Sequence, residues 1–338
     1  MPKPTTIEIV SQRAGVSKTT VSRYLNGKYE HMSEKTKQRV KDIIEELDYQ
    51  PNFIARSLKS KKTGLIGVIV SDITNPMSVN LVKGVIDHCI QEGYQVVTAS
   101  SDEQVSKEKE YVLSMLNRQV EGLVVNIVDY NDYELLKSLA ERGEKIVLAD
   151  RTICESHLDM VTTDNYDMTR TAIKAMYDQG FDIVGFFSSS LLKSNVRLTR
   201  YNAFLDESSK YVPASKDLAY LLNNEAEYEP SLRDFLAKSR GKKAAIFAST
   251  PMALLNLVSA AHELGLQIPQ DLGICGYDNL PWTKLMGLSV VEQPFYEVGL
   301  ESAKILIDRI KNGLPEGKPK YVELKSNLVL RSSTQITK

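Results

Sequence analysis

From residue 65 onward, short apolar runs alternate with longer amphipathic stretches, and this alternation restricts the body of the chain to few folds. The run 65–70 is apolar throughout, as is typical of a strand buried on both faces of a parallel sheet. The stretch after it places Leu81, Val82 and Val85 on one helical face. Six further strands are predicted at 95–99, 123–128, 145–149, 183–187, 244–248 and 272–276. Strands that alternate with helices predict parallel sheets with right-handed crossovers, so the body belongs to the α/β class.

The length of the chain indicates more than one domain. With 338 residues, two or three domains are expected, and the body alone is too long for one doubly wound sheet. We therefore expect two parallel-sheet subdomains. No apolar run is long enough to cross a membrane, and residues 1–6 do not resemble a signal peptide, so we expect no membrane association and a cytoplasmic location.

The few cysteines and histidines do not form a metal or disulfide pattern. Cys89, Cys154 and Cys275 are odd in number and far apart, which favours reduced thiols. The four histidines lack the spacing of metal ligands. We therefore expect no metal site and no cofactor.

Residues 5–48 have a different pattern, which predicts a small all-α head. Its three helices are expected over 6–13 after a cap at Thr5 or Thr6, over 18–25 after Ser17, and over 34–48 after Ser33. Thr5 and Glu8 match the spacing of a capping box. Gly15 supplies a turn between the first two helices, which makes them a helix-turn-helix.

The second helix of the head has the composition of a helix that enters the major groove of DNA. Short polar and cationic side chains surround the apolar Val21, and they are Ser17, Lys18, Thr19, Thr20, Ser22, Arg23 and Asn26. Hydroxyls, amides and cations can reach base edges and phosphates. The alternative from spacing alone is a small helical bundle with a solvated polar face.

The charge distribution agrees with a polyanion partner for the head. Residues 1–62 contain 13 Lys and Arg against 7 Asp and Glu, whereas the whole chain has a net charge of −1. A basic head on an acidic body suggests nucleic acid at the head only.

Two segments carry a family resemblance. Residues 14–27, with the sequence AGVSKTTVSRYLNG, resemble the headpiece of the lactose repressor family of bacterial regulators. Residues 49–58, with the sequence YQPNFIARSL, resemble the hinge helix of that family. The resemblance implies double-stranded DNA as partner, with further contacts from Thr6, Asn52, Ala55 and Leu58. Leu58 matches the leucine that wedges a base step in the minor groove.

The resemblance also implies a domain plan. A helix-turn-helix headpiece at 1–48 precedes a hinge at 49–63 and an effector-binding and dimerisation domain at 64–338. The latter is expected to have the type I periplasmic-binding-protein fold, with three crossings near residues 163, 291 and 322. The N-subdomain then covers about 64–163 and 292–322, and the C-subdomain about 164–291 and 323–338.

Effector contacts are expected in the cleft between the subdomains, at the carboxyl ends of strands. The resemblance assigns five of the predicted residues by their match to family positions: Asp150, Arg151, Arg200, Asp278 and Gln293. The other predicted residues are Arg197, which lies near Arg200, and Met77, Ser249 and Thr250, which lie at the cleft where the chain departs from the family pattern. Each polar one is alternatively a solvated loop position or a helix cap. Ser249-Thr250 replaces a frequent Asn-Asp of the family, and Asn75-Pro76-Met77-Ser78 replaces Asn-Pro-Phe-Phe.

The predicted function is a ligand-responsive transcriptional regulator of carbohydrate-utilisation genes that binds a pseudo-palindromic operator. The resemblance implies repression as the output, and an activator or a corepressor-dependent regulator is the alternative. The effector is expected to be a sugar, sugar acid or sugar phosphate, and the arginines favour an acid. The end of the chain has no leucine heptads, so a homodimer is expected. A receptor or enzyme with the same body fold is the alternative, but the head and the absence of a Gly-x-Gly-x-x-Gly, P-loop or Gly-x-Ser-x-Gly pattern speak against an enzyme.

Overall fold

The computed structural model describes residues 5–49, 63–153, 157–313 and 319–336. The chain divides into two compact units, residues 1–63 and 64–338, which we describe separately. The predicted hinge helix with Asn52, Ala55 and Leu58 lies outside the described residues, as does Cys154.

The first unit is a three-helix head. Its helices are α1 (Ile7–Arg13), α2 (Lys18–Leu25) and α3 (Glu34–Glu46). Val10, Val21 and Val40, one from each helix, are fully buried and form its core with Ala14 and Tyr49.

The predicted caps of α2 and α3 are confirmed, whereas the capping box of α1 is wrong. Ser17 accepts from the backbone N–H of Thr20, and Ser33 caps α3 in the same way. Thr6 rather than Thr5 caps α1, accepting from Ile9 N. This moves Glu8 to the second helical position, from which it reaches Lys18 instead of the cap. The third helix ends at Glu46, before Asp48 adopts a left-handed φ of 43°.

The second unit contains two six-stranded sheets, as expected for two doubly wound subdomains. The first sheet has the order β11-β5-β4-β3-β1-β2 and consists of β1 (Leu65–Val70), β2 (Gln95–Ser100), β3 (Gly122–Val125), β4 (Ile146–Ala149), β5 (Asp159–Thr163) and β11 (Tyr321–Leu324). The second has the order β12-β10-β9-β8-β6-β7 and consists of β6 (Ile183–Ser189), β7 (Ala219–Leu222), β8 (Ala244–Ala248), β9 (Gly273–Tyr277), β10 (Ser289–Glu292) and β12 (Asn327–Val329). All neighbouring strands are parallel except β10 and β12.

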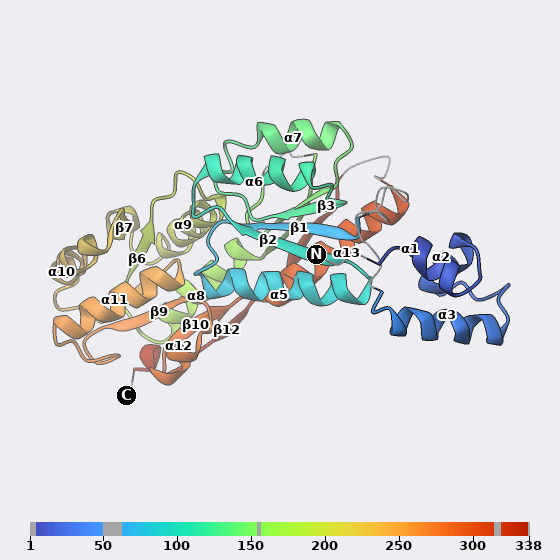
Figure 1. Cartoon of the computed structure of the whole chain (residues 1–338). Coiled ribbons are helices and arrows are strands. Elements are labelled where there is room, and N and C mark those ends of the chain that lie inside the picture. Colours follow the sequence, from blue (N-terminus) through green and yellow to red (C-terminus); the bar gives the residue numbers. More distant parts are fainter. Residues whose placement is uncertain (1–4, 50–62, 154–156, 314–318, 337–338) are drawn as a thin grey trace. The chain divides into compact units, whose positions relative to one another are not determined.

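Helices cover both faces of the first sheet (Figure 1). They are α5 (Pro76–Gln91) and α13 (Phe295–Asn312) on one face, and α6 (Val105–Asn117) and α7 (Glu134–Glu141) on the other. Two glycines allow α5 and α13 to approach closely. A Cβ on Gly84 would lie 2.0 Å from Tyr296 O, and one on Gly299 would lie 1.9 Å from Leu81 O.

The second sheet has a single large core, in which the helices pack in pairs. These helices are α8 (Asn165–Asp178) with α9 (Asn195–Ser208), and α10 (Tyr228–Lys238) with α11 (Pro251–Glu263), followed by the short α12 (Pro281–Leu285). Phe186, Phe187, Phe247 and Tyr277 are fully buried there. We call the two sheets with their helices the first and second lobes.

The chain passes between the lobes three times. It crosses at Asp164, between β5 and α8, at Gln293-Pro294, between β10 and α13, and at Lys325-Ser326, between β11 and β12. The last two crossings lie a few residues beyond the positions predicted near 291 and 322. Among the described residues, no helix is both long and apolar enough to cross a membrane.

The predicted strand 123–128 is three residues too long. Asn126 turns its side-chain Oδ1 to Ser71, accepting from its hydroxyl at 2.7 Å. The carbonyls of Ile127 and Val128 each accept a 3.0 Å hydrogen bond from Arg151. These carbonyls therefore hold Arg151 at the edge of the sheet where the predicted effector residues of the first lobe lie.

Candidate functional site

The outer surface of α2 presents the side chains predicted to contact DNA. Ser17, Lys18, Thr19, Arg23 and Asn26 are exposed. Thr20 and Ser22 are half-buried, and Thr6 is exposed at the start of α1. Apart from Thr6, the predicted headpiece residues therefore lie on α2 or at its two caps.

Several of these side chains already have partners within the head. Ser17 Oγ lies 3.0 Å from Thr20 Oγ1, and Asn26 Nδ2 donates to Ser22 O at 2.7 Å. Thr19 and Arg23 have exposed side chains without hydrogen bonds or ion pairs to the described residues. Their polar atoms remain available for base edges or phosphates.

Lys18 forms an ion pair within the head. Its Nζ lies 2.7 Å from Glu8 Oε1, and both side chains are 56% exposed. An exposed pair of this kind contributes little stability, so DNA phosphate can compete for the ammonium.

In the second unit, a buried polar network lies where the chain passes between the lobes. Arg200 on α9 is its centre and is only 4% exposed. The guanidinium donates to Asn165 Oδ1 at 2.8 Å, to Ser249 O at 2.6 Å and to Gln293 Oε1 at 2.8 Å. Its Cζ also lies 3.4 Å from the ring centroid of Tyr277. These contacts hold the Arg200 guanidinium in a fixed position within the buried network.

Gln293 connects this network to a buried carboxyl group. Its Nε2 donates to Asp278 Oδ1 at 2.7 Å, and its Oε1 accepts from Thr163 Oγ1 at 2.9 Å. Burial raises the pKa of Asp278 to about 6, although the charge of Arg200 opposes the shift. Asp278 has a left-handed φ of 77° immediately after β9.

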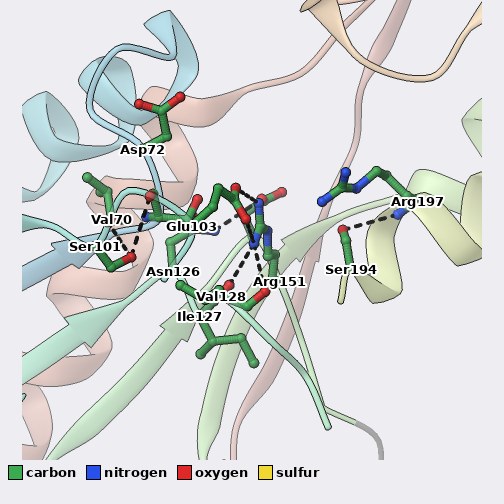
Figure 2. Close-up of polar contacts among 12 residues, drawn as sticks. Val70, Asp72, Ser101, Glu103, Asn126, Ile127, Val128, Arg151, Ser194 and Arg197 are labelled. Carbon is green, nitrogen blue, oxygen red and sulfur yellow. Dashed lines mark hydrogen bonds and ion pairs between the residues drawn. The ribbon is translucent and has the colours of Figure 1, made fainter. Parts of the chain in front are cut away.

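Arg151 lies at the corresponding edge of the first lobe (Figure 2). It follows β4, and its side chain is 11% exposed. Besides the carbonyls of Ile127 and Val128, it binds both carboxylate oxygens of Glu103, at 3.1 and 2.5 Å. Sequence reasoning missed Glu103, which lies 48 residues away in the sequence.

Arg197 on α9 faces this pair from the second lobe (Figure 2). Its backbone N–H bonds to Ser194 Oγ, but its guanidinium has no hydrogen bond or ion pair to any of the residues that the structure describes. The pKa of Arg197 is lowered, first by burial and then by the positive charge of Arg151. A negative group between the two arginines would offset both effects.

Asp150 supplies an acceptor beside them. Its Oδ2 accepts from Asn126 Nδ2 at 3.2 Å, while the buried Oδ1 has no hydrogen-bond partner among the described residues. Burial raises the pKa of Asp150, against the opposing charges of Arg151 and Arg200. A buried acceptor without a partner favours a donor such as a ligand hydroxyl.

The remaining predicted effector residues have structural partners. Met77 is 7% exposed and packs in the first-lobe core. Ser249 is fully buried and its Oγ bonds to Ser188 Oγ at 2.7 Å. Thr250 caps α11, and its Oγ1 accepts from Ala253 N at 3.2 Å.

Two hydrogen bonds join the lobes near this site. Asn195 Nδ2 donates to Thr152 Oγ1 at 2.7 Å, and Asn131 Nδ2 donates to Leu192 O at 3.0 Å. Among the described residues, no group of three His, Cys, Asp or Glu side chains could hold a metal ion.

Comparisons with known proteins find a family match in each of the two units. Residues 6–52 match the family described as bacterial regulatory proteins, lacI family, and residues 173–334 match a periplasmic binding protein-like domain. The chain is 35% identical over 335 residues to the HTH-type transcriptional regulator KdgR of Bacillus subtilis, covering 97% of both chains. It is 34% identical over 332 residues to the regulator PtxS of Pseudomonas putida, covering 98% of this chain and 96% of the relative.

A solved structure supports the predicted fold. The lac repressor dimer bound to operator and the anti-inducer ONPF matches with a TM-score of 0.84 at 22% identity, covering 99% of this chain and 100% of that chain. At this identity the likeness bears on the fold, and it confirms the helix-turn-helix head and the two parallel-sheet lobes.

Proposed function

The chain belongs to the lacI family of bacterial regulatory proteins and is a DNA-binding transcriptional regulator, and from that membership we propose that it represses genes of carbohydrate use in response to an acidic sugar derivative. It acts in the cytoplasm as a homodimer on a pseudo-palindromic double-stranded DNA operator. The effector binds between the lobes of the second unit. The protein performs no catalysis and needs no metal or cofactor.

One observation carries the effector class: the Arg197 guanidinium faces Arg151 without an anionic partner of its own among the described residues. Two cations brought together in a half-buried place favour a ligand with negative charge. The buried Oδ1 of Asp150, which has no partner among the described residues, would accept from a hydroxyl of the same ligand. A sugar acid has both groups, whereas a neutral sugar leaves Arg197 unpaired.

DNA recognition is proposed for the exposed residues of α2, with Thr19 and Lys18 at base edges. The hinge that contains Asn52, Ala55 and Leu58 is proposed to enter the minor groove when DNA is bound. DNA recognition and the response to the effector are therefore proposed to reside in the same chain, which acts as a dimer. A receptor or enzyme with the same body fold would have no use for the helix-turn-helix.

Control is proposed to work through a population shift between lobe arrangements. The effector acts only by its different affinity for the two arrangements. Effector binding at Arg151 and Arg197 is proposed to change the arrangement of the two lobes. It would do so through contacts that cross between the lobes, such as the hydrogen bond from Asn195 to Thr152.

A thermal-shift screen tests the effector class. D-gluconate, 2-keto-D-gluconate and D-glucuronate are compared with neutral D-glucose and with glucose 6-phosphate. A ligand at 100 times its Kd stabilises the fold by about 2.7 kcal/mol, so a true effector raises Tm measurably. We expect stabilisation by at least one acid and none by glucose, and a gel-shift assay with the active acid then gives the direction of the response.

The matched variants are Arg197→Met and Arg233→Met. Arg233 is a 65% exposed residue of α10 that pairs with Glu229, in the same lobe. Arg197→Met should abolish the shift and Arg233→Met should keep it. Stabilisation by glucose with no response to the acids or the phosphate would overturn the proposed effector class.

A further inference from the structure

The carboxylate of Glu103 holds Arg151 in the manner expected of a bound ligand. Each carboxylate oxygen meets one guanidinium nitrogen, Oε2 at Nη1 and Oε1 at Nη2. This two-point geometry is the one in which arginine binds the carboxylate of a small acid. Figure 2 shows the pair directly opposite the guanidinium of Arg197.

The backbone that presents Glu103 has an unusual conformation. Asp102 and Glu103 follow each other with left-handed φ angles of 51° and 56°, which are uncommon for residues other than glycine. Glu103 N donates to Ser71 O at 2.8 Å, and Asp102 Oδ1 accepts from Ser100 Oγ at 2.8 Å. These bonds hold the turn in place, and such strain tends to persist at functional positions.

The partners of Arg151 differ between its two terminal nitrogens. Nη1 also donates to the carbonyls of Ile127 and Val128, whereas Nη2 meets only Glu103 among the described residues. If Glu103 moved away, the carbonyls would keep Arg151 in position, and Nη2 would face Arg197 without a partner. The Glu103 side chain is 43% exposed, so it can move into solvent.

Glu103 is also held electrostatically by both arginines. Burial raises the pKa of the Glu103 carboxyl, but the hydrogen bonds and charge of Arg151, with the charge of Arg197, outweigh this and hold the pKa below its usual range. The carboxylate is therefore charged at neutral pH and partly satisfies the same cations that an acidic effector would need.

We propose that Glu103 is an internal competitor that occupies the anion position of the effector site, so that an acidic effector must displace it from Arg151. The inference rests on the proposed acidic effector. It makes Glu103 a specificity-determining residue: the residue lowers the affinity for simple anions and reserves the site for ligands with further contacts. A neutral sugar would gain nothing from its removal.

The experiment compares wild type with Glu103→Gln. The control variant is Glu110→Gln, at an exposed position of α6. Isothermal titration uses D-gluconate and 2-keto-D-gluconate, and thermal shift uses inorganic phosphate as a simple anion. Removing a partly exposed competing pair should lower the Kd for the acids and the phosphate by about fivefold. Glu110→Gln should bind like wild type, and D-glucose should show no gain with any variant.

A second pair of variants keeps the result interpretable. Glu103→Asp retains the charge but withdraws the carboxylate, so its affinity for anions should lie between wild type and Glu103→Gln. The double variant Glu103→Gln, Arg197→Met should lose the gain for phosphate. Unchanged or weaker anion binding by Glu103→Gln, or a gain that survives the loss of Arg197, overturns the proposal.

The outcome separates this inference from the proposed effector class. Acids that bind wild type and Glu103→Gln equally would leave the acidic effector standing and remove Glu103 as a competitor. A phosphate response that requires Arg197 and increases in Glu103→Gln, without any response to sugar acids, would support the competitor role and reject the acidic sugar.

Discussion

Asn195 of the second lobe donates a 2.7 Å hydrogen bond from Nδ2 to Thr152 Oγ1 of the first lobe, one residue after Arg151. The two residues lie next to the proposed effector position in the sequence, since Asn195 lies two residues before Arg197. If the effector contacts both lobes there, the arrangement that binds it is the one in which this bond joins them.

The first prediction is that Thr152→Val weakens effector binding. Valine has nearly the same shape but cannot accept the hydrogen bond, and the loss of one such bond costs about 0.5–1.5 kcal/mol. If the effector prefers the joined lobes, its Kd should rise by a factor of about 2 to 10. Isothermal titration with the acid that gives the largest thermal shift measures the change.

The control for this variant is Thr171→Val. Thr171 is an exposed residue of α8 whose hydroxyl donates to Asp167 O within one lobe. It should leave the Kd unchanged. Equal affinity of Thr152→Val and wild type would mean that the effector does not distinguish joined from separated lobes.

The second prediction concerns the ion pair between Glu8 and Lys18 in the head. Glu8→Gln removes the carboxylate that holds the Lys18 ammonium and a negative charge from the surface proposed to meet phosphate. Because an exposed pair is worth about 0.2–1 kcal/mol, DNA affinity should increase by about two- to fivefold. Fluorescence anisotropy on operator and random DNA measures both affinities, and a loss of affinity would show that the pair positions Lys18 for binding.

Local patterns predicted the head almost residue by residue. The cap Ser17, the buried Val21 and the turn glycine Gly15 are all properties of a short stretch of sequence, and α2 has the predicted bounds. The capping box failed because Thr6 caps α1, and the residue three positions after Thr6 is Ile9 rather than Glu8. Only the packing of α1 against α2 decides that Glu8 faces Lys18.

Five strands were missed from sequence. β7, β11 and β12 lie at sheet edges, and β5 begins with the charged Asp159. β10 is central and mostly buried, but it is only four residues long and has Ser289 and Glu292 at its ends. Asp159 is buried because Arg309 of α13 binds both of its carboxylate oxygens, at 2.8 and 3.1 Å. A partner so distant in sequence gives no local pattern.

The same reason limits what sequence could predict about the effector site. Family resemblance pointed to Arg151 and Arg200, but not to their different partners. Arg200 is supported by backbone and amide acceptors, whereas Arg151 is held by Glu103. Which guanidinium lacks a partner is a property of three-dimensional packing, and among the described residues Arg197 is the one of the three without a hydrogen bond or ion pair to its guanidinium.

The third prediction concerns sequence-specific DNA reading by α2. Thr19 is exposed and its hydroxyl is not used by the described residues, so Thr19→Ala should not disturb the head. If the hydroxyl or methyl meets a base edge, the change should cost about 1–3 kcal/mol on the preferred operator. Binding to random DNA should change little, and preference should relax at one base position in a selection experiment. An equal loss on both DNAs would assign Thr19 to the phosphate backbone.

The fourth prediction concerns Glu108 of α6, a carboxyl group that is 3% exposed. Its Oε2 accepts from Val128 N at 2.6 Å, beside the carbonyls that hold Arg151. Burial raises the pKa of Glu108 from 4.5 to about 7, against the opposing effects of the Val128 N–H and the charge of Arg151. The nearby Lys109 and Asp132 pair with each other at 2.8 Å.

The raised pKa makes the fold less stable as the pH rises. Between pH 4.5 and about 7 the unfolded chain loses this proton while the folded protein keeps it, so the free energy of unfolding falls across that window and then levels off. Glu108→Gln keeps an acceptor for Val128 N without the ionisation. The variant should therefore gain up to about 3 kcal/mol over wild type at pH 8 and nothing at pH 4.5.

Urea unfolding at several pH values between 4.5 and 8 measures this difference. Asp150 and Asp278 also have raised pKa values, but they are present in both proteins and cancel in the comparison. The exposed Glu110 provides the control, because Glu110→Gln should run parallel to wild type at every pH. A constant difference between Glu108→Gln and wild type would mean that Glu108 is already ionised in the folded protein at low pH, held by Arg151 and the Val128 N–H.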